Sequence, residues 1–411
     1  MSWLNVLALC VVLSSASCST DNLSGDIEVE VLVVNGVDPS NGAPSFALNR
    51  QTLRGVENLQ KLETAFLRVV RGGVLRVDEI SNADVVEPIE FRDGQSADLR
   101  YYTDDGVVVA RDYSGVIMLS ALYSAQETAL SLDAIGVARD DFFSRGRFEV
   151  LFEPEFRASA GEVEVVVRPK LNAFFLPGAN QFGLAQRSFI ETVPIGANPV
   201  VLAHEFGHAL FEFLFYDGLA PSSCDANPEQ GRLFGEYAIA GFNEGYGDFV
   251  AFSRFGITNP LFAFSDRIDI SDRGFSSEYV YDDLEDEKVC GGRFYCIGTL
   301  FARSLYLAYL ALGDDPLDEL ARSRFASTVN SALQGTRQRV LASGLLPAIE
   351  PDPCTAKESI ELGRDGQVTG AFLSSFAAGL PATEQIQVCA EFVRQFGAIG
   401  FPTTHRGVCG L

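Results

Sequence analysis

The stretch NPVVLAHEFGHALFEFLF, residues 198–215, decides the fold of this chain. Asn198 can cap a helix whose first position is Pro199, because an Asn side chain accepts a backbone N–H bond and Pro has no N–H to lose. No cluster of helix-breaking residues follows until 217–231, where Gly, Pro and Cys gather. The sequence therefore predicts a helix from residue 199 that continues through HEFGH, residues 204–208.

Two of the three histidines of the chain are His204 and His208. Residues i and i+4 of a helix lie about 40° apart around its axis, so both imidazoles face the same side. This geometry lets both bind one Zn²⁺, and Glu205 is placed to take a proton from water that the metal activates. The alternative, two core histidines on an apolar helix, requires a hydrogen-bond partner for each ring and a costly buried glutamate.

A catalytic zinc site needs a third protein ligand and an open position for water. Because no third histidine lies nearby, we expect a carboxylate. The segment GFNEGYGDFVAF, residues 241–252, has Glu244 and Asp248 at i and i+4, on one face of a predicted helix. One carboxylate can bind the metal while the other orients an imidazole through its second nitrogen. The alternative is a pair of surface acids, but the surrounding Phe and Val residues favour a buried face.

HEFGH followed by NEGYGD resembles the gluzincin metallopeptidases, above all the thermolysin and fungalysin branches. The resemblance implies an α+β, thermolysin-like zincin fold, in which a strand-rich N-terminal part with an edge strand over the site precedes a helical C-terminal part. It also implies His204, His208 and Glu244 as zinc ligands. Glu205 would be the general base, and Asp248 the carboxylate that orients an imidazole.

The segment LNAFF, residues 171–175, resembles the edge strand with which these enzymes bind extended peptides. The resemblance implies Asn172 and Ala173 as substrate-binding residues and a peptide or protein as the substrate. Capture of a peptide by strand addition is a general mode, because main-chain hydrogen bonds at a sheet edge supply the affinity.

The chain departs from the family at the residue that stabilises the oxyanion. Those enzymes carry a His shortly before a Gly on a later helix, and the matching segment here, residues 293–310, has no His. Tyr295 lies three residues before Gly298, and a Tyr hydroxyl can donate a hydrogen bond to an oxyanion. The remaining histidine, His405, is the alternative donor if the fold brings the C-terminus to the site.

The N-terminus predicts export. Residues 3–13 form an apolar run that is too short to span a bilayer and is typical of a signal peptide, although a buried N-terminal strand or helix is the alternative. SSAS before Cys18 resembles a bacterial lipoprotein cleavage site, which predicts a lipid on Cys18 and an outer-membrane or secreted location; Ser15 stands where that pattern has Leu.

Six further cysteines fit three disulfides, with Cys290–Cys296 the first expected pair: Cys224, Cys290, Cys296, Cys354, Cys389 and Cys409.

Composition excludes some partners. The 411 residues have a formal net charge of −24, which disfavours nucleic acid because phosphate binding needs Lys and Arg. The acidic run YDDLEDE, residues 281–287, could bind Ca²⁺, but it lacks the DxDxDG spacing and a solvated acidic loop is the alternative.

Hydrophobic periodicity predicts the remaining elements. Strands are expected at 26–35, within 72–113, and as a pair at 147–153 and 162–168. Helices are expected at 56–71, 115–137 (amphipathic), 233–255, 296–312, 317–335 and 384–396, with a loop at 351–370. The resulting domains are a signal peptide (1–18), an N-terminal domain of unknown role (19–140), a zincin core (141–255) and a helical part that completes it (256–411).

Together these patterns predict an exported zinc-dependent endopeptidase. Two alternatives stay open. A degenerate peptidase that only binds zinc would explain the missing histidine, and a lipid-anchored interaction protein would explain the unmatched N-terminal part. The presence of Glu205 favours the enzyme, because only catalysis needs a proton acceptor beside the metal.

Overall fold

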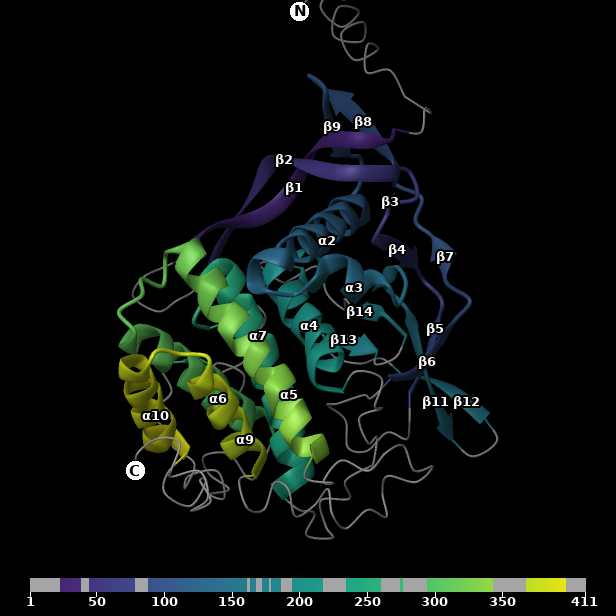
Figure 1. Ribbon diagram of the computed structural model, residues 1–411. Helices are drawn as coiled ribbons and strands as arrows, with labels where there is room; N and C mark the ends of the chain where they lie inside the picture. Colours follow the sequence, from purple (N-terminus) through teal and green to yellow (C-terminus); the bar gives the residue numbers. More distant parts are fainter. Residues whose placement is uncertain are drawn as a thin grey trace, which may run out of the picture.

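The computed structural model describes residues 23–37, 44–77, 88–160, 163–167, 172–176, 179–185, 194–216, 234–259, 274–275, 294–342 and 367–396. The expected signal peptide with Cys18, the acidic run 281–287 and His405 lie outside these residues. The fold is mixed α/β, with strands concentrated in the first half of the chain and helices in the second (Figure 1). Within the described part, no helix is both long and apolar enough to cross a membrane.

A ten-stranded sheet runs through the first half of the chain. Its strand order is β13-β14-β10-β4-β3-β2-β1-β9-β8, with β7 paired to β4. β10 runs parallel to both β4 and β14, whereas β13 and β14 are antiparallel. The strands are β1 (Gly25–Val37), β2 (Pro44–Asn58), β3 (Glu63–Thr64), β4 (Leu67–Arg71), β7 (Gln95–Ser96), β8 (Tyr101–Asp104), β9 (Val107–Ala110), β10 (Phe148–Phe152), β13 (Asn172–Leu176) and β14 (Gln181–Ala185).

A second sheet of four strands has the order β12-β11-β5-β6. Its strands are β5 (Val74–Val77), β6 (Pro88–Arg92), β11 (Glu155–Ala160) and β12 (Val163–Val167). The strands predicted at 147–153 and 162–168 exist as β10 and β12, but they do not pair, because they belong to different sheets.

The two sheets are joined where the parallel strands β4 and β10 end together. Gly72 and Gly73 have positive φ angles of 64° and 87°, and Glu153 has a φ of 51°. The Gly72 N–H donates to Phe152 O (2.9 Å), and the Glu155 N–H donates to Gly73 O (2.9 Å). The segments after β4 and β10 therefore turn side by side from the large sheet into β5 and β11 of the second sheet. Since β12 pairs with β11 in that second sheet, the predicted pairing of β10 with β12 was wrong.

The helix predicted at 56–71 was also wrong, since this segment forms the end of β2, then β3 and β4. Asn58 Oδ1 accepts from the Lys61 N–H (2.9 Å), and Leu62 has a φ of 53°, so the chain reverses in a tight turn. The backbone then pairs across the turn, with Val56 opposite Thr64. Sheet pairing thus overrode an apolar spacing that fits a helix equally well.

Helix α2 (Tyr113–Leu130) packs between the large sheet and the helices of the second half (Figure 1). Asp112 caps it, and it ends before a short 3₁₀ turn, η1 (Asp133–Ile135), so the predicted helix 115–137 is two elements. The predicted amphipathic character was wrong, because α2 is buried on nearly all sides. Its polar side chains bond to the sheet instead: Gln126 exchanges two hydrogen bonds with the backbone of Arg54.

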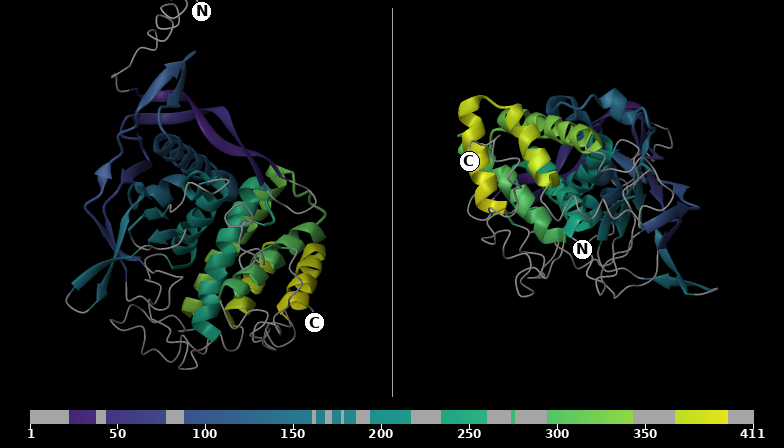
Figure 2. Two further views of the ribbon diagram at one scale, coloured as in Figure 1. Left: turned by 180° about the vertical axis from the view of Figure 1, so that it is seen from behind. Right: turned by 60° about the horizontal axis from the view of Figure 1, so that its bottom comes forward.

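The second half of the chain supplies most of the helices (Figures 1 and 2). The helices expected from residue 199 and at 233–255, 296–312, 317–335 and 384–396 are confirmed as α4, α5, α6, α7 and α10. Of the loop expected at 351–370, residues 367–370 belong instead to α9, a helix that the sequence did not reveal, and the rest lie outside the described residues. The bounds are α3 (Arg139–Phe143), η2 (Ile195–Ala197), α4 (Pro199–Phe211), the π-helical turn η3 (Glu212–Tyr216), α5 (Phe234–Phe255), α6 (Phe294–Ala311), α7 (Glu319–Ala342), α9 (Gln367–Ala378) and α10 (Ala382–Phe396).

One hydrophobic core joins the sheet to these helices. The rings of Phe148 on β10 and Phe182 on β14 lie 6.0 and 5.4 Å from the ring of Phe206 on α4. A smaller cluster packs Val34 and Phe46, from β1 and β2, against residues of α4 and α5. The described residues on both sides of position 140, the expected domain boundary, therefore support the HEFGH helix.

Candidate metal centre

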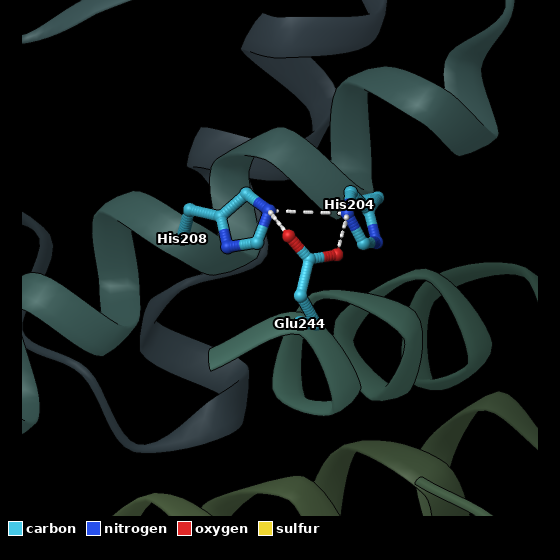
Figure 3. A group of neighbouring side chains, drawn as sticks. All are labelled: His204, His208 and Glu244. Carbon is cyan, nitrogen blue, oxygen red and sulfur yellow. Dashed lines mark hydrogen bonds and ion pairs between the residues drawn. The ribbon is translucent and has the colours of Figure 1, made fainter. Parts of the chain in front are cut away.

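Helix α4 brings the two imidazoles together. Asn198 Oδ1 accepts from the Val200 N–H (3.0 Å) and Pro199 is the first helical residue, as predicted. His204 and His208 lie one turn apart, and their Nε2 atoms are 3.1 Å from each other (Figure 3). Their side chains are only 8% and 11% exposed, so the pair lies at the inner face of the helix.

Helix α5 adds a carboxylate to this pair. Glu244 Oε2 lies 3.5 Å from His204 Nε2, and Glu244 Oε1 lies 3.7 Å from His208 Nε2 (Figure 3). One ligand atom from each of the three residues lies within 4.8 Å of the others. The Glu244 side chain is 17% exposed, so the group retains some contact with solvent. The structure thus assembles the three residues that the sequence predicted as ligands.

Each imidazole is oriented through its other nitrogen. Asp248 Oδ1 lies 2.9 Å from His204 Nδ1, and the Asp248 side chain is fully buried. Asn243 Oδ1 lies 3.0 Å from His208 Nδ1. The role of Asn243 was missed by the sequence analysis, although it directly precedes Glu244. Its signal is the helix geometry, since Asn243 and Asp248 lie on either side of Glu244 and each faces one ring.

The ring tautomers follow from these contacts. A carboxylate oxygen and an amide carbonyl oxygen only accept hydrogen bonds, so the tautomer that matches both neighbours has the proton on Nδ1 and a lone pair on Nε2. The two Nε2 atoms and the Glu244 carboxylate are then acceptors that face one another, which calls for a cation between them. Around a tetrahedral Zn²⁺ with bonds of about 2.0–2.1 Å, ligand atoms lie about 3.3 Å apart. The separations of 3.1, 3.5 and 3.7 Å fit this donor set.

Glycines allow the helices to approach closely enough for this geometry. A Cβ at Gly207 of α4 would lie 2.6 Å from the Cα of Gly247 on α5. A Cβ at Gly247 would lie 2.8 Å from the His204 ring, and one at Gly245 would overlap the carbonyl oxygen of Gly298 on α6. Any larger residue would therefore separate the helices or displace an imidazole.

For the other predicted site residues within the described part, the structure gives the position in the fold. Glu205 follows His204 on α4 and is 5% exposed. Ala173 lies on β13 opposite Leu184, with Asn172 opposite Ala185, and among the described strands β13 is an edge of the large sheet. Tyr295 lies in the first turn of α6, one turn before Gly298, but its side chain is outside the described part.

Comparisons with known proteins do not identify a family. No family model matches the chain, and no curated protein matches it. Among solved structures, the fold aligns with the precursor of protealysin, a metalloproteinase from Serratia proteamaculans, over 80% of this chain and 88% of that chain. The sequence identity is 12% and the TM-score is 0.38, a level that does not establish a shared fold. The His-His-Glu cluster itself has the composition of a zincin site.

Proposed function

We propose that this protein is a zinc-dependent endopeptidase of the gluzincin type, with a thermolysin-like arrangement of the site. The observation that carries the proposal is the convergence of three acceptor atoms, from His204, His208 and Glu244. Asp248 and Asn243 orient the two imidazole rings. Nitrogen and carboxylate donors in this number are typical of catalytic zinc sites, which keep one position open.

The chemistry that we propose assigns a role to each group of the chain. A zinc ion held by the three ligands would lower the pKa of a water molecule toward neutrality and polarise the substrate carbonyl. Glu205 would take the proton as the water oxygen adds to the carbonyl carbon, and would give it to the amine nitrogen as the C–N bond breaks. Tyr295, or alternatively His405, would donate a hydrogen bond to the oxyanion.

We propose that β13 binds the substrate. An edge strand presents unpaired N–H and C=O groups, and an extended peptide can add to it as a further strand. The outer edge of β13 is not paired with any described strand, and β13 contacts the HEFGH helix α4. Main-chain bonds to Asn172 and Ala173 would therefore align a peptide beside the metal centre.

Export remains a proposal from the sequence, with a lipid on Cys18 or release into the medium. Cys389 is 1% exposed and disulfide-bonded, which supports an oxidising compartment. The side chains of the other five expected disulfide cysteines, including Cys290 and Cys296, lie outside the described residues. The Ca²⁺ site considered for 281–287 lies outside them as well.

The second candidate is a degenerate peptidase that binds zinc without catalysis, for which the missing family histidine is the reason. Hydrolysis of casein and of quenched peptides tests both. We expect cleavage by the purified protein, loss of cleavage with a zinc chelator, and recovery on adding about one equivalent of Zn²⁺. Zinc binding without cleavage of any peptide in a broad library would favour the degenerate peptidase.

The oxyanion donor can be assigned by two variants. Tyr295→Phe is expected to lower kcat about a hundredfold to a thousandfold with KM little changed, because the contact forms only in the transition state. His405→Ala is expected to change kcat much less. The steady-state constants of both variants on one quenched peptide check this, and the opposite ranking would assign the role to His405.

A further inference from the structure

The phenol of Tyr246 lies between two residues of the metal centre in the sequence. It follows Glu244 by two positions and precedes Asp248 by two. Its side chain is fully buried, and burial raises the pKa of its hydroxyl well above the usual range. A buried hydroxyl requires a partner, and that of Tyr246 donates to Asn330 Oδ1 on α7, at 2.5 Å.

Asn330 is itself fixed from a third element. It is 2% exposed, and its Nδ2 donates to the carbonyl oxygen of Ile135, at 2.7 Å, in the turn η1 that follows α2. The next residue, Gly136, packs so closely on Ser327 of α7 that a Cβ there would overlap the Ser side chain. The bond to Ile135 O therefore orients the Asn330 amide with its Oδ1 toward the phenol.

The ring of Tyr246 also contacts the helix that carries the imidazoles. Its centroid lies 5.9 Å from that of Phe211, the last residue of α4 and three positions beyond His208. Tyr246 thus connects α4, α5 and α7 in the described structure, and it does so without contributing a ligand atom.

Helix geometry explains why this contact matters for the metal centre. Two positions correspond to about 200° around a helix, so Tyr246 lies on the opposite side of α5 from both Glu244 and Asp248. A side-chain atom lies about 5–6 Å from the helix axis. A rotation of α5 by about 20° would therefore move the Glu244 carboxylate by about 2 Å, which is the length of a metal–ligand bond.

We propose that Tyr246 and Asn330 are positioning residues of the metal centre: their hydrogen bond fixes the rotation of α5 and holds Glu244 and Asp248 against the imidazoles. The inference rests on the proposed metal site and does not depend on peptidase activity. Three ligands that are held in the geometry of the metal site before binding have a higher affinity for the ion.

The test compares two buried tyrosines that each lose one hydrogen bond. Tyr246→Phe removes the bond to Asn330. Tyr309→Phe is the matched control, because Tyr309 is equally buried and donates to Asp315 O (2.6 Å). Tyr309 lies on α6 eleven positions beyond Gly298, the residue at which α6 packs on Gly245 next to Glu244. Zinc affinity is measured by competition with a chromophoric chelator, and folding by circular dichroism. We expect the zinc Kd to rise at least tenfold in Tyr246→Phe and less than twofold in Tyr309→Phe.

Two further measurements keep the result unambiguous. Asn330→Ala, which leaves the phenol in place, is expected to raise the zinc Kd by the same factor. The visible spectrum of the Co²⁺-loaded protein should change in Tyr246→Phe and stay unchanged in Tyr309→Phe. A wild-type zinc Kd in folded Tyr246→Phe would overturn the inference, as would an equal loss in Tyr309→Phe. A wild-type protein that binds no zinc would instead overturn the metal site itself.

Discussion

Glu205→Gln is expected to bind zinc as the wild-type protein does and to lose nearly all peptide hydrolysis. Gln has the same shape as Glu, so we expect the packing around residue 205, which is 5% exposed on α4, to stay unchanged. It cannot accept a proton, however, and a positioned base contributes about 10²–10⁴-fold to the rate of such a step. The measurement is kcat/KM on a quenched peptide, with the zinc content of the same sample.

The control for this variant is Glu391→Gln, which changes an exposed ion pair with Arg394 on α10. It should leave kcat/KM unchanged. An active Glu205→Gln protein would show that another group accepts the proton, while loss of zinc in this variant would mean that Glu205 belongs to the ligand set.

Local patterns in the sequence were sufficient to predict the helices that carry the site. The cap at Asn198 and Pro199 and the spacing of His204 and His208 depend only on helix geometry. The same holds for Glu244 and Asp248, whose positions at i and i+4 placed both on one face of α5. These predictions needed no knowledge of how the helices pack.

Features that depend on neighbouring elements could not be predicted. The segment 56–71 has an apolar spacing that fits a helix, and only pairing with the rest of the sheet makes it the end of β2, a turn, and the strands β3 and β4. The pairing of Asn243 with His208 depends on the distance between α4 and α5, which Gly207 and Gly247 set. Glycine lowers helix propensity, so glycines inside a segment argue against a helix in a sequence. Here they lie at positions where α4 and α5 approach each other closely.

Glu244→Ala is expected to lose zinc. The carboxylate supplies one of three donors, and the remaining imidazoles would hold the ion without charge compensation. Asp248→Ala provides a graded comparison, because it removes the partner of His204 Nδ1 and no ligand. Loss of such a partner typically weakens metal binding about 10–100-fold, so Asp248→Ala should still reach the wild-type stoichiometry at saturating zinc.

The zinc-to-protein ratio of dialysed samples tests the metal centre most directly. The wild-type protein, purified without added chelator, is predicted to hold about one zinc ion per chain, as a single three-ligand site requires. Glu244→Ala, with unchanged circular dichroism, is predicted to hold almost none. Equal zinc in the two proteins, or no zinc in either after incubation with the metal, would contradict a site formed by His204, His208 and Glu244.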